Sequence, residues 1–534
     1  MTHLGESPKA QGVGLQVVWL KRDLRLEDHA ALTAAARQGP VALLYVFEPS
    51  LLARPEIDAS HVAFVLGTLA ALEQQLAERG VALWVELGEV VDVLDRLHHQ
   101  HRFEALYAHE ETGLFVTWDR DRAVARWARR TQVSFHEYPQ FGVFRPHPSR
   151  DGWAERWERR MRPGPLPVPE IGGPPRSPRD LPRLEDLGVA PSLKVDGPAP
   201  GRGAGVELLD SFLERRGRRY ASEMSSPVTA VESCSLLSPH LAYGTLSMRE
   251  VRQASGRRRE AALARKDADW AGSLDAFEAR LRWHCHFIQK LEDEPELEFH
   301  NAHRGYDGLR NEAPLDAWSA SERRRLRAWI EGRTGYPMVD AAMRHLHRTG
   351  WINFRLRAML VSFACHHLWL HWREPAVALA AHFVDFEPGI HFSQFQMQAG
   401  TTGINTPRIY NVLKQAEEQD PEGLFIRREL PELEGVPNAY LPCPGRMPTD
   451  LQRRTGCKIG RDYPPPIVEH GTAMSAARQR LEGMKRRPEL RAEAERVVAR
   501  HGSRKSPTGA PRSTPGAPPR ASHSRRRRGS RTLT

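Results

Sequence analysis

The chain has 534 residues, of which 40% are hydrophobic and 27% are charged, and its formal net charge is +11. This length predicts a globular protein with two or more domains. Because no apolar run approaches the length of a membrane span and the N-terminus lacks the pattern of a signal peptide, we expect a soluble, cytoplasmic protein. The five cysteines are widely spaced and odd in number, which argues against a disulfide framework.

Residues 1–14 form an N-terminal extension, after which short β-rich runs alternate with helical patterns as far as residue 145. The runs are LQVVWL, VALLYVF, ALWVEL, EALYAH and VSFHEY. This alternation is typical of a doubly wound parallel sheet in an α/β domain. The first run leads into KRDLRLEDHAAL without a glycine in the turn, so we do not expect an NAD site of the Rossmann type.

Eleven prolines between residues 161 and 200 predict a long linker, to which we assign residues 146–205. From residue 206 to residue 500, apolar residues recur at three- and four-residue intervals, which predicts an all-α second domain. Residues 501–534 hold nine Lys or Arg and no acid, and their composition predicts a disordered basic tail. The tail serves solubility or contacts phosphate nonspecifically.

Two groups of residues have side chains that can bind metals but lack the spacing of a metal-binding motif. His284, Cys285 and His286 are adjacent, so they point around a helix and not to one face. Cys443 and Cys457 lack the CxxC partners that an iron-sulfur cluster needs. We therefore expect no metal site.

Several long motifs occur in one order along the chain: VVWLKRDLRLEDHAAL, SLLSPHLAYGTLS, GYPMVDAAMRHLHRTGW, FRLRAMLVSF and RIYNVLKQAEEQDPEGLFIRRELPEL. In this order they resemble the photolyase and cryptochrome family over nearly the whole chain except the tail. The resemblance implies an α/β domain able to hold an antenna chromophore of unidentified kind, and a helical domain that binds FAD.

The resemblance also implies an activity, in which light-excited reduced flavin repairs pyrimidine dimers in DNA by electron transfer. DNA with a flipped lesion would then be the partner of a monomeric, carbon-carbon lyase type of enzyme. One alternative is a cryptochrome-like blue-light photoreceptor without repair activity. Another is a redox flavoprotein whose light response is incidental.

The stretch CSLLSP matches the phosphate loop of the family, where hydroxyls and backbone amides receive the FAD pyrophosphate. Tyr220 resembles the tyrosine that covers the FAD, and Trp351 the tryptophan that lines the flavin and substrate cavity. The loop residues implied as FAD contacts are Cys234, Ser235, Leu236, Leu237 and Ser238.

Arg357 and Asp385 match an ion pair beside the flavin ring, where Arg357 stabilises anionic reduced flavin. In VDFEPGIHFSQFQMQAG, the resemblance implies that Phe386 and Glu387 also contact the cofactor and that His391 meets the flavin N5 atom. Arg357 and His391 are the implied catalytic residues. His391 either changes its protonation near neutral pH or remains a neutral hydrogen-bond donor.

Four residues are implied to face DNA. Trp283 and the cation Arg355 are retained, whereas Arg280 stands where dimer-repairing relatives carry a substrate-binding glutamate, and Met397 where a second stacking tryptophan is common. Direct repair of cyclobutane dimers is therefore not assured by the motifs.

An electron relay is implied by Trp372 and Trp318, which resemble its second and third members. Phe395 occupies the position of the first member, and phenylalanine is much harder to oxidise than tryptophan. We expect slow photoreduction of oxidised FAD through this route, unless Trp369 or Trp351 provides a bypass.

Overall fold

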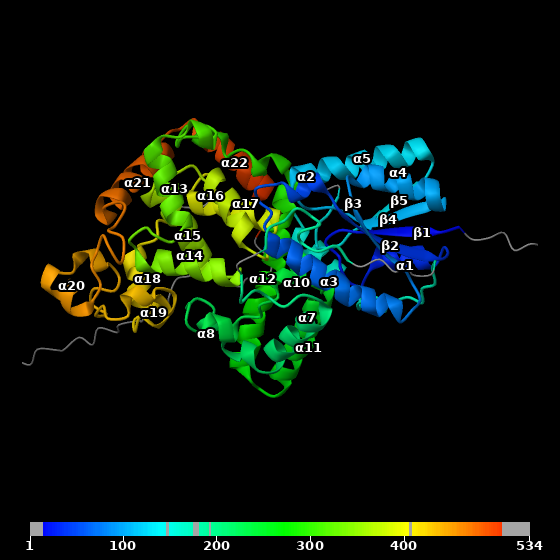
Figure 1. The fold of residues 1–534 in the computed structure, drawn as a ribbon, viewed down its shortest axis with the longest axis horizontal. Helices are drawn as coiled ribbons and strands as arrows, with labels where there is room; N and C mark the ends of the chain where they lie inside the picture. The colour runs from blue at the N-terminus through cyan, green and yellow to red at the C-terminus, as the bar shows by residue number, and fades with distance from the viewer. Residues whose placement is uncertain (1–13, 146–148, 175–180, 192–193, 405–407, 505–534) are drawn as a thin grey trace, which may run out of the picture.

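The computed structural model describes residues 14–145, 149–174, 181–191, 194–404 and 408–504. An α/β domain lies beside a larger helical domain (Figure 1). Residues 1–13 of the predicted extension and 505–534 of the predicted tail lie outside the described residues.

Five parallel strands form one sheet in the order β3-β2-β1-β4-β5. In this sheet Val18 of β1 pairs with Leu43 of β2 on one side and with Tyr107 of β4 on the other. Each predicted β-rich run forms one strand, so the doubly wound sheet is confirmed. The strands are β1 (Gln16–Leu20), β2 (Val41–Phe47), β3 (Leu83–Leu87), β4 (Ala105–His109) and β5 (Ser134–Tyr138).

Helices cover both faces of the sheet because successive side chains of a strand point to opposite faces. Val18 and Leu20 pack in a core with α1 and α3, whereas Val17 and Trp19 pack in a core with α4 and α5. The two helix pairs lie on opposite sides of the sheet in Figure 1. The helices are α1 (Ala30–Ala36), α2 (Pro49–Leu52), α3 (Ala59–Ala77), α4 (Val90–His101) and α5 (Phe115–Thr131).

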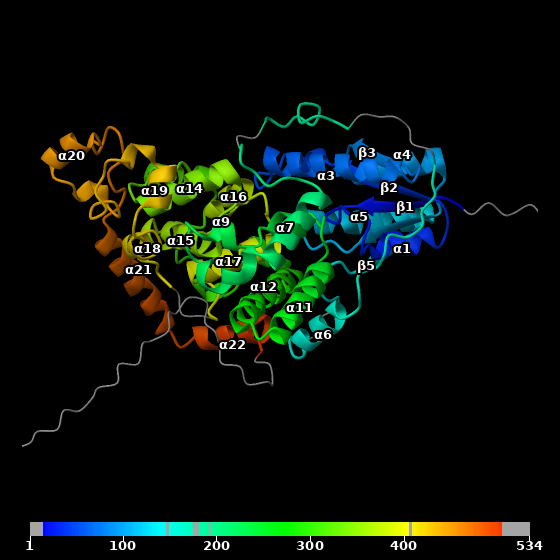
Figure 2. The same ribbon diagram turned by 90° about the horizontal axis from the view of Figure 1, so that it is seen from below.

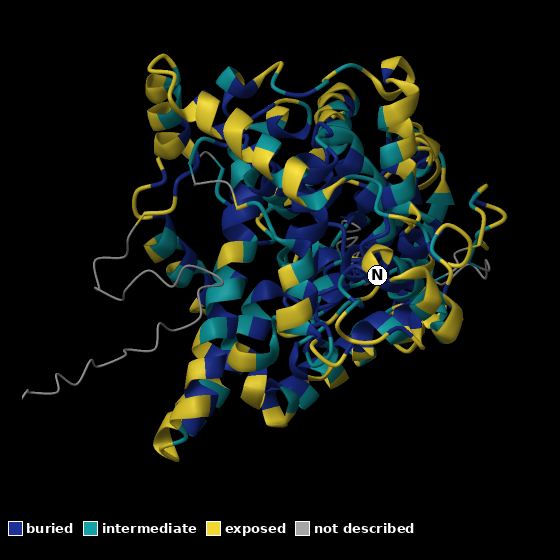
Figure 3. Ribbon diagram, turned by 90° about the vertical axis from the view of Figure 1, so that its left-hand side faces the viewer, coloured by how far each residue is buried: buried dark blue, intermediate teal, exposed yellow. Residues whose placement is uncertain are grey.

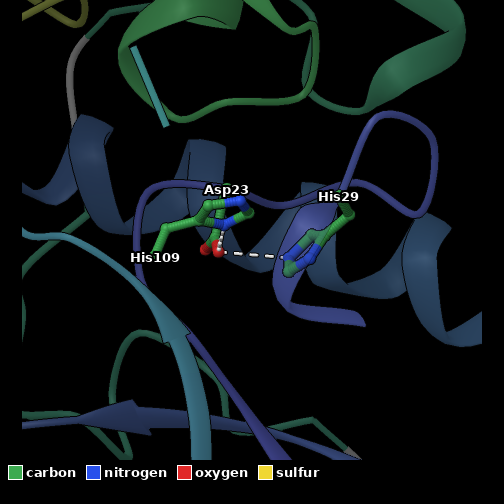
Figure 4. Close-up of side chains that lie close together, drawn as sticks. All are labelled: Asp23, His29 and His109. Atoms are coloured by element: carbon green, nitrogen blue, oxygen red, sulfur yellow. Dashed lines mark hydrogen bonds and ion pairs between the residues drawn. The ribbon is translucent and has the colours of Figure 1, made fainter. Parts of the chain in front are cut away.

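A buried hydrogen-bonded cluster stabilises the glycine-free turn after β1 (Figure 4). His109 donates from Nδ1 to Asp23 Oδ2 over 2.7 Å, and His29 Nε2 lies 3.1 Å from the same oxygen. His29 Nδ1 accepts from the Leu32 amide, so its Nε2 carries the hydrogen. The other oxygen, Oδ1, accepts from the Lys21 amide.

This Asp23 cluster has the residue types of a metal site, and its ligand atoms all lie within 4.8 Å of one another. The single acceptor lone pair of neutral His29, on Nδ1, is already used by the Leu32 amide, so the cluster is a structural tie between β1, α1 and β4. Burial alone would raise the pKa of Asp23, but the hydrogen bonds from His109 and His29 hold it well below its ordinary value.

Replacing Asp23 with alanine should lower the free energy of unfolding by about 2–4 kcal/mol, because buried N–H donors lose their acceptor. Since folding lowers the pKa of Asp23, its contribution is present above the unfolded pKa of about 3.9 and is lost as the pH falls toward the folded value. Urea unfolding across pH should show a constant difference from wild type near neutrality and a shrinking one below about pH 4. The exposed Asp92→Ala is the control, and an equal loss in both variants would contradict the role of the cluster.

Two arginines of the same KRDLR stretch join the two domains. Arg22 donates to the carbonyls of Ala242 and Phe386 over 2.8 and 2.7 Å. Arg25 donates to the carbonyl of Gly244 over 2.9 Å. The turn after β1 therefore fixes the helical domain against the carboxyl end of the sheet.

The range predicted as a linker, 146–205, contains a helix, α6 (Trp153–Met161), so that prediction is wrong in its first part. The helix forms because Trp153, Trp157 and Met161 recur every four residues, and all three are buried. Residues 164–174 form no helix or strand and run along the α/β domain (Figure 2), where the carbonyl of Gly172 accepts from the Val41 amide.

The second domain is helical, as predicted, and begins at α7, four residues before the predicted boundary. Its longest helix, α12, packs against α11 and α17. Figure 3 shows buried residues on the inner faces of the helices and exposed residues on the outer faces.

The helices of this domain are α7 (Arg202–Glu214), α8 (Tyr220–Glu223), α9 (Ala230–Ser233), α10 (Ser238–Ala242), α11 (Met248–Ala264), α12 (Ala268–Asp293), α13 (Ala320–Ile330), α14 (Pro337–Thr349), α15 (Phe354–Ser362), α16 (Arg373–His382), α17 (Pro388–Ala399), α18 (Val412–Gln419), α19 (Leu424–Glu429), α20 (Thr449–Thr455), α21 (His470–Lys485) and α22 (Leu490–His501). A π-helical turn, Phe363–His367, follows α15. Within the described residues, none of these helices is long and apolar enough to cross a membrane.

Candidate functional site

The predicted ion pair is formed between α15 and the loop that precedes α17. Arg357 Nη2 lies 2.5 Å from Asp385 Oδ2, and the guanidinium stands 3.9 Å from the centre of the Phe383 ring. Arg357 Nε donates to the carbonyl of Ile352. The cation is thus held by a carboxylate, a carbonyl and an aromatic face.

Several buried acceptors on the loop and helix that follow Val384 have no hydrogen-bond donor among the described residues. They are Asp385 Oδ1, Glu387 Oε1, Ser393 Oγ and Gln394 Oε1, whereas Glu387 Oε2 lies 3.2 Å from Arg22 Nη2. Buried polar atoms are normally paired, so their grouping indicates a ligand that brings N–H or O–H donors. A flavin, with its ring N–H groups and ribityl hydroxyls, fits this set.

Glu387 lies between this site and the α/β domain. Its carboxylate is 3.2 Å from Arg22 Nη2, and burial raises the pKa of Glu387 to about 7 although Arg22 lowers it. A donor from a bound ring would stabilise the ionised form of this carboxyl group.

His391 is buried among phenylalanine rings. Of the two alternatives stated above, the surroundings favour the neutral hydrogen-bond donor over a group whose protonation changes near neutral pH. Burial lowers the pKa of His391 to about 4, and its Nε2 donates to the carbonyl of Ala376 over 2.8 Å. Its ring centre lies 4.9 to 6.1 Å from those of four aromatic neighbours, Phe383, Phe386, Phe392 and Phe395. The ring is therefore a fixed, neutral imidazole.

The predicted phosphate loop contains a strained residue. Leu236 has a φ of 60°, a left-handed conformation that costs a non-glycine residue about 1–2 kcal/mol. Within the described part of the chain, the amides of Ser235 and Leu236 donate to no acceptor. Successive free amides around a left-handed residue form a concave anion site, as a pyrophosphate requires.

Arg216, which was not among the predicted site residues, is hydrogen-bonded to the backbone of this loop. Its guanidinium donates to the carbonyls of Cys234 and Ser235, and its Nε donates to Ser211 Oγ. These partners are backbone carbonyls and a hydroxyl, which leave no pattern in the sequence.

We expect Arg216→Met to weaken FAD binding about tenfold by loosening the loop, because charged hydrogen bonds contribute about 1.5–3 kcal/mol each. Riboflavin, which lacks the pyrophosphate, should bind this variant and the wild type equally. Fluorescence titration measures both affinities, with the exposed neighbour Arg215→Met as control. Equal weakening of both ligands would indicate a general structural defect instead.

The structure brings Tyr220 of the predicted cofactor site next to Arg280 of the predicted substrate site. Burial raises the pKa of the Tyr220 hydroxyl to about 12, although the positive charge of Arg280 lowers it. Tyr220 and Cys234 belong to one apolar cluster, against which the half-buried Trp351 and Leu236 also pack.

Trp283 lies on α12, one turn after Arg280, and 37% of it is exposed. It stacks on Phe287 with ring centres 5.5 Å apart. Arg355 and Met397 lie half-buried on α15 and α17 and share no hydrogen bond or aromatic contact with Trp283. Arg355 donates to Gln415 over 3.3 Å, and its buried Nε has no partner among the described residues.

The structure places Phe392 between His391 and Trp372. Its ring centre lies 5.5 Å from that of His391 and 6.3 Å from that of Trp372, whereas Phe395 contacts His391 at 4.9 Å. Trp318 is only 2% exposed and bonds to the carbonyl of Ala313. The aromatic side chain that contacts both His391 and Trp372 is therefore a phenylalanine.

Trp369 is a poor bypass. It lies between the guanidinium groups of Arg310 and Arg480, each 4.5 Å from its ring, and has a φ of 54°. Removing an electron leaves a positive ring, which two neighbouring cations oppose.

The three adjacent residues His284, Cys285 and His286 point to different surroundings. His284 contacts the Phe141 ring, and His286 accepts from Arg150 over 3.1 Å. Cys285 is buried, and burial raises its thiol pKa to about 11. They do not converge on one point.

A second cavity, of about 170 Å³, lies at the carboxyl ends of β1 and β2. The strand order reverses between β1 and β4, and Glu111 and Leu114 after β4 also line the cavity, so it lies at a common ligand position in such sheets. The walls are mainly apolar and include charged side chains and one residue of the loop that precedes α17. Among the lining residues are Tyr45, Phe47, His61, Arg120, Tyr243 and Phe386.

Comparisons with known proteins agree with this geometry. Residues 16–151 match the family model for DNA photolyase, and residues 277–483 match the model for the FAD binding domain of DNA photolyase. A deoxyribodipyrimidine photo-lyase of Thermus thermophilus is 32% identical over 460 residues, which cover 84% of this chain and 99% of the relative.

Solved structures show the same fold. A class III photolyase from Agrobacterium tumefaciens aligns with a TM-score of 0.78 at 26% identity, covering 90% of this chain and 100% of that chain. A Sulfolobus tokodaii photolyase with two FAD molecules aligns with a TM-score of 0.69 at 25% identity, covering 88% and 100%. Since both domains match in sequence and structure, the chain belongs to the photolyase and cryptochrome family and contains its FAD-binding domain.

Proposed function

We propose that this protein is a light-driven DNA repair enzyme that acts on a pyrimidine lesion flipped out of the duplex. The observation that carries the proposal is the Arg357–Asp385 pair, beside which a row of buried acceptors lacks donors. When bound, reduced FAD supplies the electron that splits the lesion under light and receives it back.

In this proposal, the protein's own residues bind and orient the flavin and the DNA. Arg357 balances negative charge on the ring, while Asp385 and Glu387 accept from its N–H groups. Trp283 presents an exposed aromatic face on which a flipped base stacks, and such stacking contributes about 1–3 kcal/mol per base. Arg355, which is half-buried, supplies a positive charge for the DNA.

Arg280 sets the choice of lesion in this proposal. A guanidinium only donates hydrogen bonds, whereas the glutamate of dimer-repairing relatives accepts them. Arg280 therefore favours a lesion that presents carbonyl or ring-nitrogen acceptors at this point, next to Tyr220.

Binding to damaged duplexes tests this assignment. We expect the protein to prefer one of the two main ultraviolet lesions over intact DNA, with about 5- to 100-fold weaker lesion binding in Trp283→Ala. Arg280→Glu should shift the preference toward the cyclobutane dimer. The control is Arg282→Glu, a half-buried arginine on the same helix. An Arg280→Glu variant with unchanged preference would contradict the role of Arg280.

A blue-light photoreceptor is the second candidate. Arg280 and Met397 depart from the pattern of dimer-repairing relatives, and this departure is the observation that supports a signalling role. Wild-type protein that binds FAD but neither lesion would support this candidate.

We also propose that the cavity at the sheet edge binds a second, light-harvesting chromophore. Its apolar walls and its contact with Phe386 support this role. The Sulfolobus tokodaii relative contains two FAD molecules. An absorbing compound beyond one FAD per chain in the native protein, lost when Tyr45→Trp fills the cavity, is the expected result.

A further inference from the structure

Trp283, Phe287 and Lys290 follow one another along one face of α12, at spacings of four and three residues. Trp283 is exposed and stacks on Phe287, and the Phe287 ring centre lies 4.9 Å from Lys290 Nζ. The helix rises roughly 10 Å over seven residues. Since one strand of a duplex places a phosphate about every 3.4 Å along its axis, a base stacked on Trp283 leaves a phosphate of the same strand near Lys290.

The ammonium group of Lys290 lacks a counter-ion. Its side chain is half-buried, and within the described part of the chain it forms no hydrogen bond or ion pair, only the contact with the Phe287 ring. Burial and the charge of Arg150 lower the pKa of Lys290 to about 7. Because a cation withdrawn from water is costly unless it is paired, this environment indicates an anionic ligand.

Arg150, in the loop that precedes α6, adds a second positive charge behind Lys290. It is 4% exposed and donates to the carbonyl of His286 over 3.2 Å. The Asp293 carboxylate lies 3.8 Å from Arg150 Nη1, too far for a hydrogen bond, and burial raises the pKa of Asp293 to about 6. Asp293 therefore offsets at most one of the two cations.

Two histidines also face Lys290, one on α12 and one at the end of α22. Burial lowers the pKa of His501 to about 4 and that of His286 well below its ordinary value, so both rings are neutral near pH 7. The Glu294 carboxylate is paired with His501 Nε2 at 2.6 Å. Since α22 lies beyond residue 483, where the match to the FAD-domain model ends, this corner extends past the matched domain.

We propose that Lys290 binds a phosphate of the DNA strand whose flipped base stacks on Trp283. The inference rests on the proposed DNA binding and adds a backbone contact outside the flavin site. The ammonium group meets the phosphate as a point charge, and the buried guanidinium of Arg150 makes the local potential positive. A phosphate favours the charged amine, so binding takes up a proton when the pH exceeds the pKa of free Lys290.

Fluorescence anisotropy with labelled duplexes compares wild type with Lys290→Met, which keeps an apolar stem over Phe287 and loses the charge. At about pH 6 and low salt, Lys290→Met should bind intact and lesion-containing duplexes about 3- to 10-fold more weakly. The slope of log affinity against log salt should fall in magnitude by about 1. Trp283→Ala should weaken lesion binding alone. Lys485→Met, at an exposed lysine of α21, is the control, and equal flavin content in all variants shows that they fold.

The pH dependence gives a second readout. Wild-type affinity should be greatest below about pH 7 and fall as the pH rises toward about 9, because free Lys290 loses its charge. Lys290→Arg, which stays charged, should remove this fall. An unchanged salt slope in Lys290→Met, with lesion binding intact, overturns the inference and leaves Lys290 as a cover for Phe287. So does Lys290→Arg with the wild-type pH dependence. Wild-type protein that binds neither duplex would refute the proposed function as well.

Discussion

Arg357→Ala is expected to purify with little or no FAD. The substitution leaves Asp385 as an uncompensated charge in a buried site, which typically costs about 3–5 kcal/mol. It also removes the cation that balances the reduced ring. Flavin content after gentle purification, measured by absorbance and by reconstitution with excess FAD, checks this result.

Arg355→Ala provides a matched control on the same helix. Arg355 is also half-buried, but it donates its hydrogen bond to Gln415 and not to a carboxylate. It should retain about one FAD per chain. An Arg357→Ala protein that retains as much FAD as Arg355→Ala would contradict the assignment of the ion pair to the flavin.

Photoreduction of oxidised FAD is expected to be slow in wild type and several-fold faster in Phe395→Trp. Phe395 contacts His391, and Phe392 contacts both His391 and Trp372. Phenylalanine does not readily give up an electron. A tryptophan at position 395 supplies an oxidisable ring beside the cofactor. Blue-light reduction with an external donor measures the rate.

The photoreduction rate of Trp372→Phe, made in the wild-type background, is measured alongside that of Phe395→Trp. This substitution should change the slow rate little, because the relay is already interrupted before Trp372. Fast wild-type reduction that Trp372→Phe abolishes would mean that electrons pass Phe392 and that the relay is intact.

The strands could be predicted from the sequence because their apolar runs are local, and each run became one strand. The Asp23 cluster could not be predicted from the sequence. It forms only because β1 and β4 are neighbours, and local sequence patterns do not determine the order of strands in a sheet. The helix α6 was not predicted, because the many prolines that follow it led to the assignment of all of residues 146–205 to a linker.

At the candidate site, the Arg357–Asp385 pair could be predicted because both residues lie in long, ordered motifs. Arg216 could not, since its partners are carbonyls that any residue provides. The state of His391 also depends on a carbonyl, that of Ala376 on another helix. Sequence patterns identify side chains, whereas these roles depend on backbone groups that only the fold brings near.

Repair of damaged DNA by the reduced, FAD-loaded protein tests the central claim most directly. Duplex oligonucleotides that carry either of the two main ultraviolet lesions are incubated with the full chain in blue light and in the dark, and restored bases are quantified. The proposed function predicts light-dependent restoration of at least one lesion, strongly reduced in Trp283→Ala. No restoration of either lesion by protein with intact, reduced flavin would contradict it.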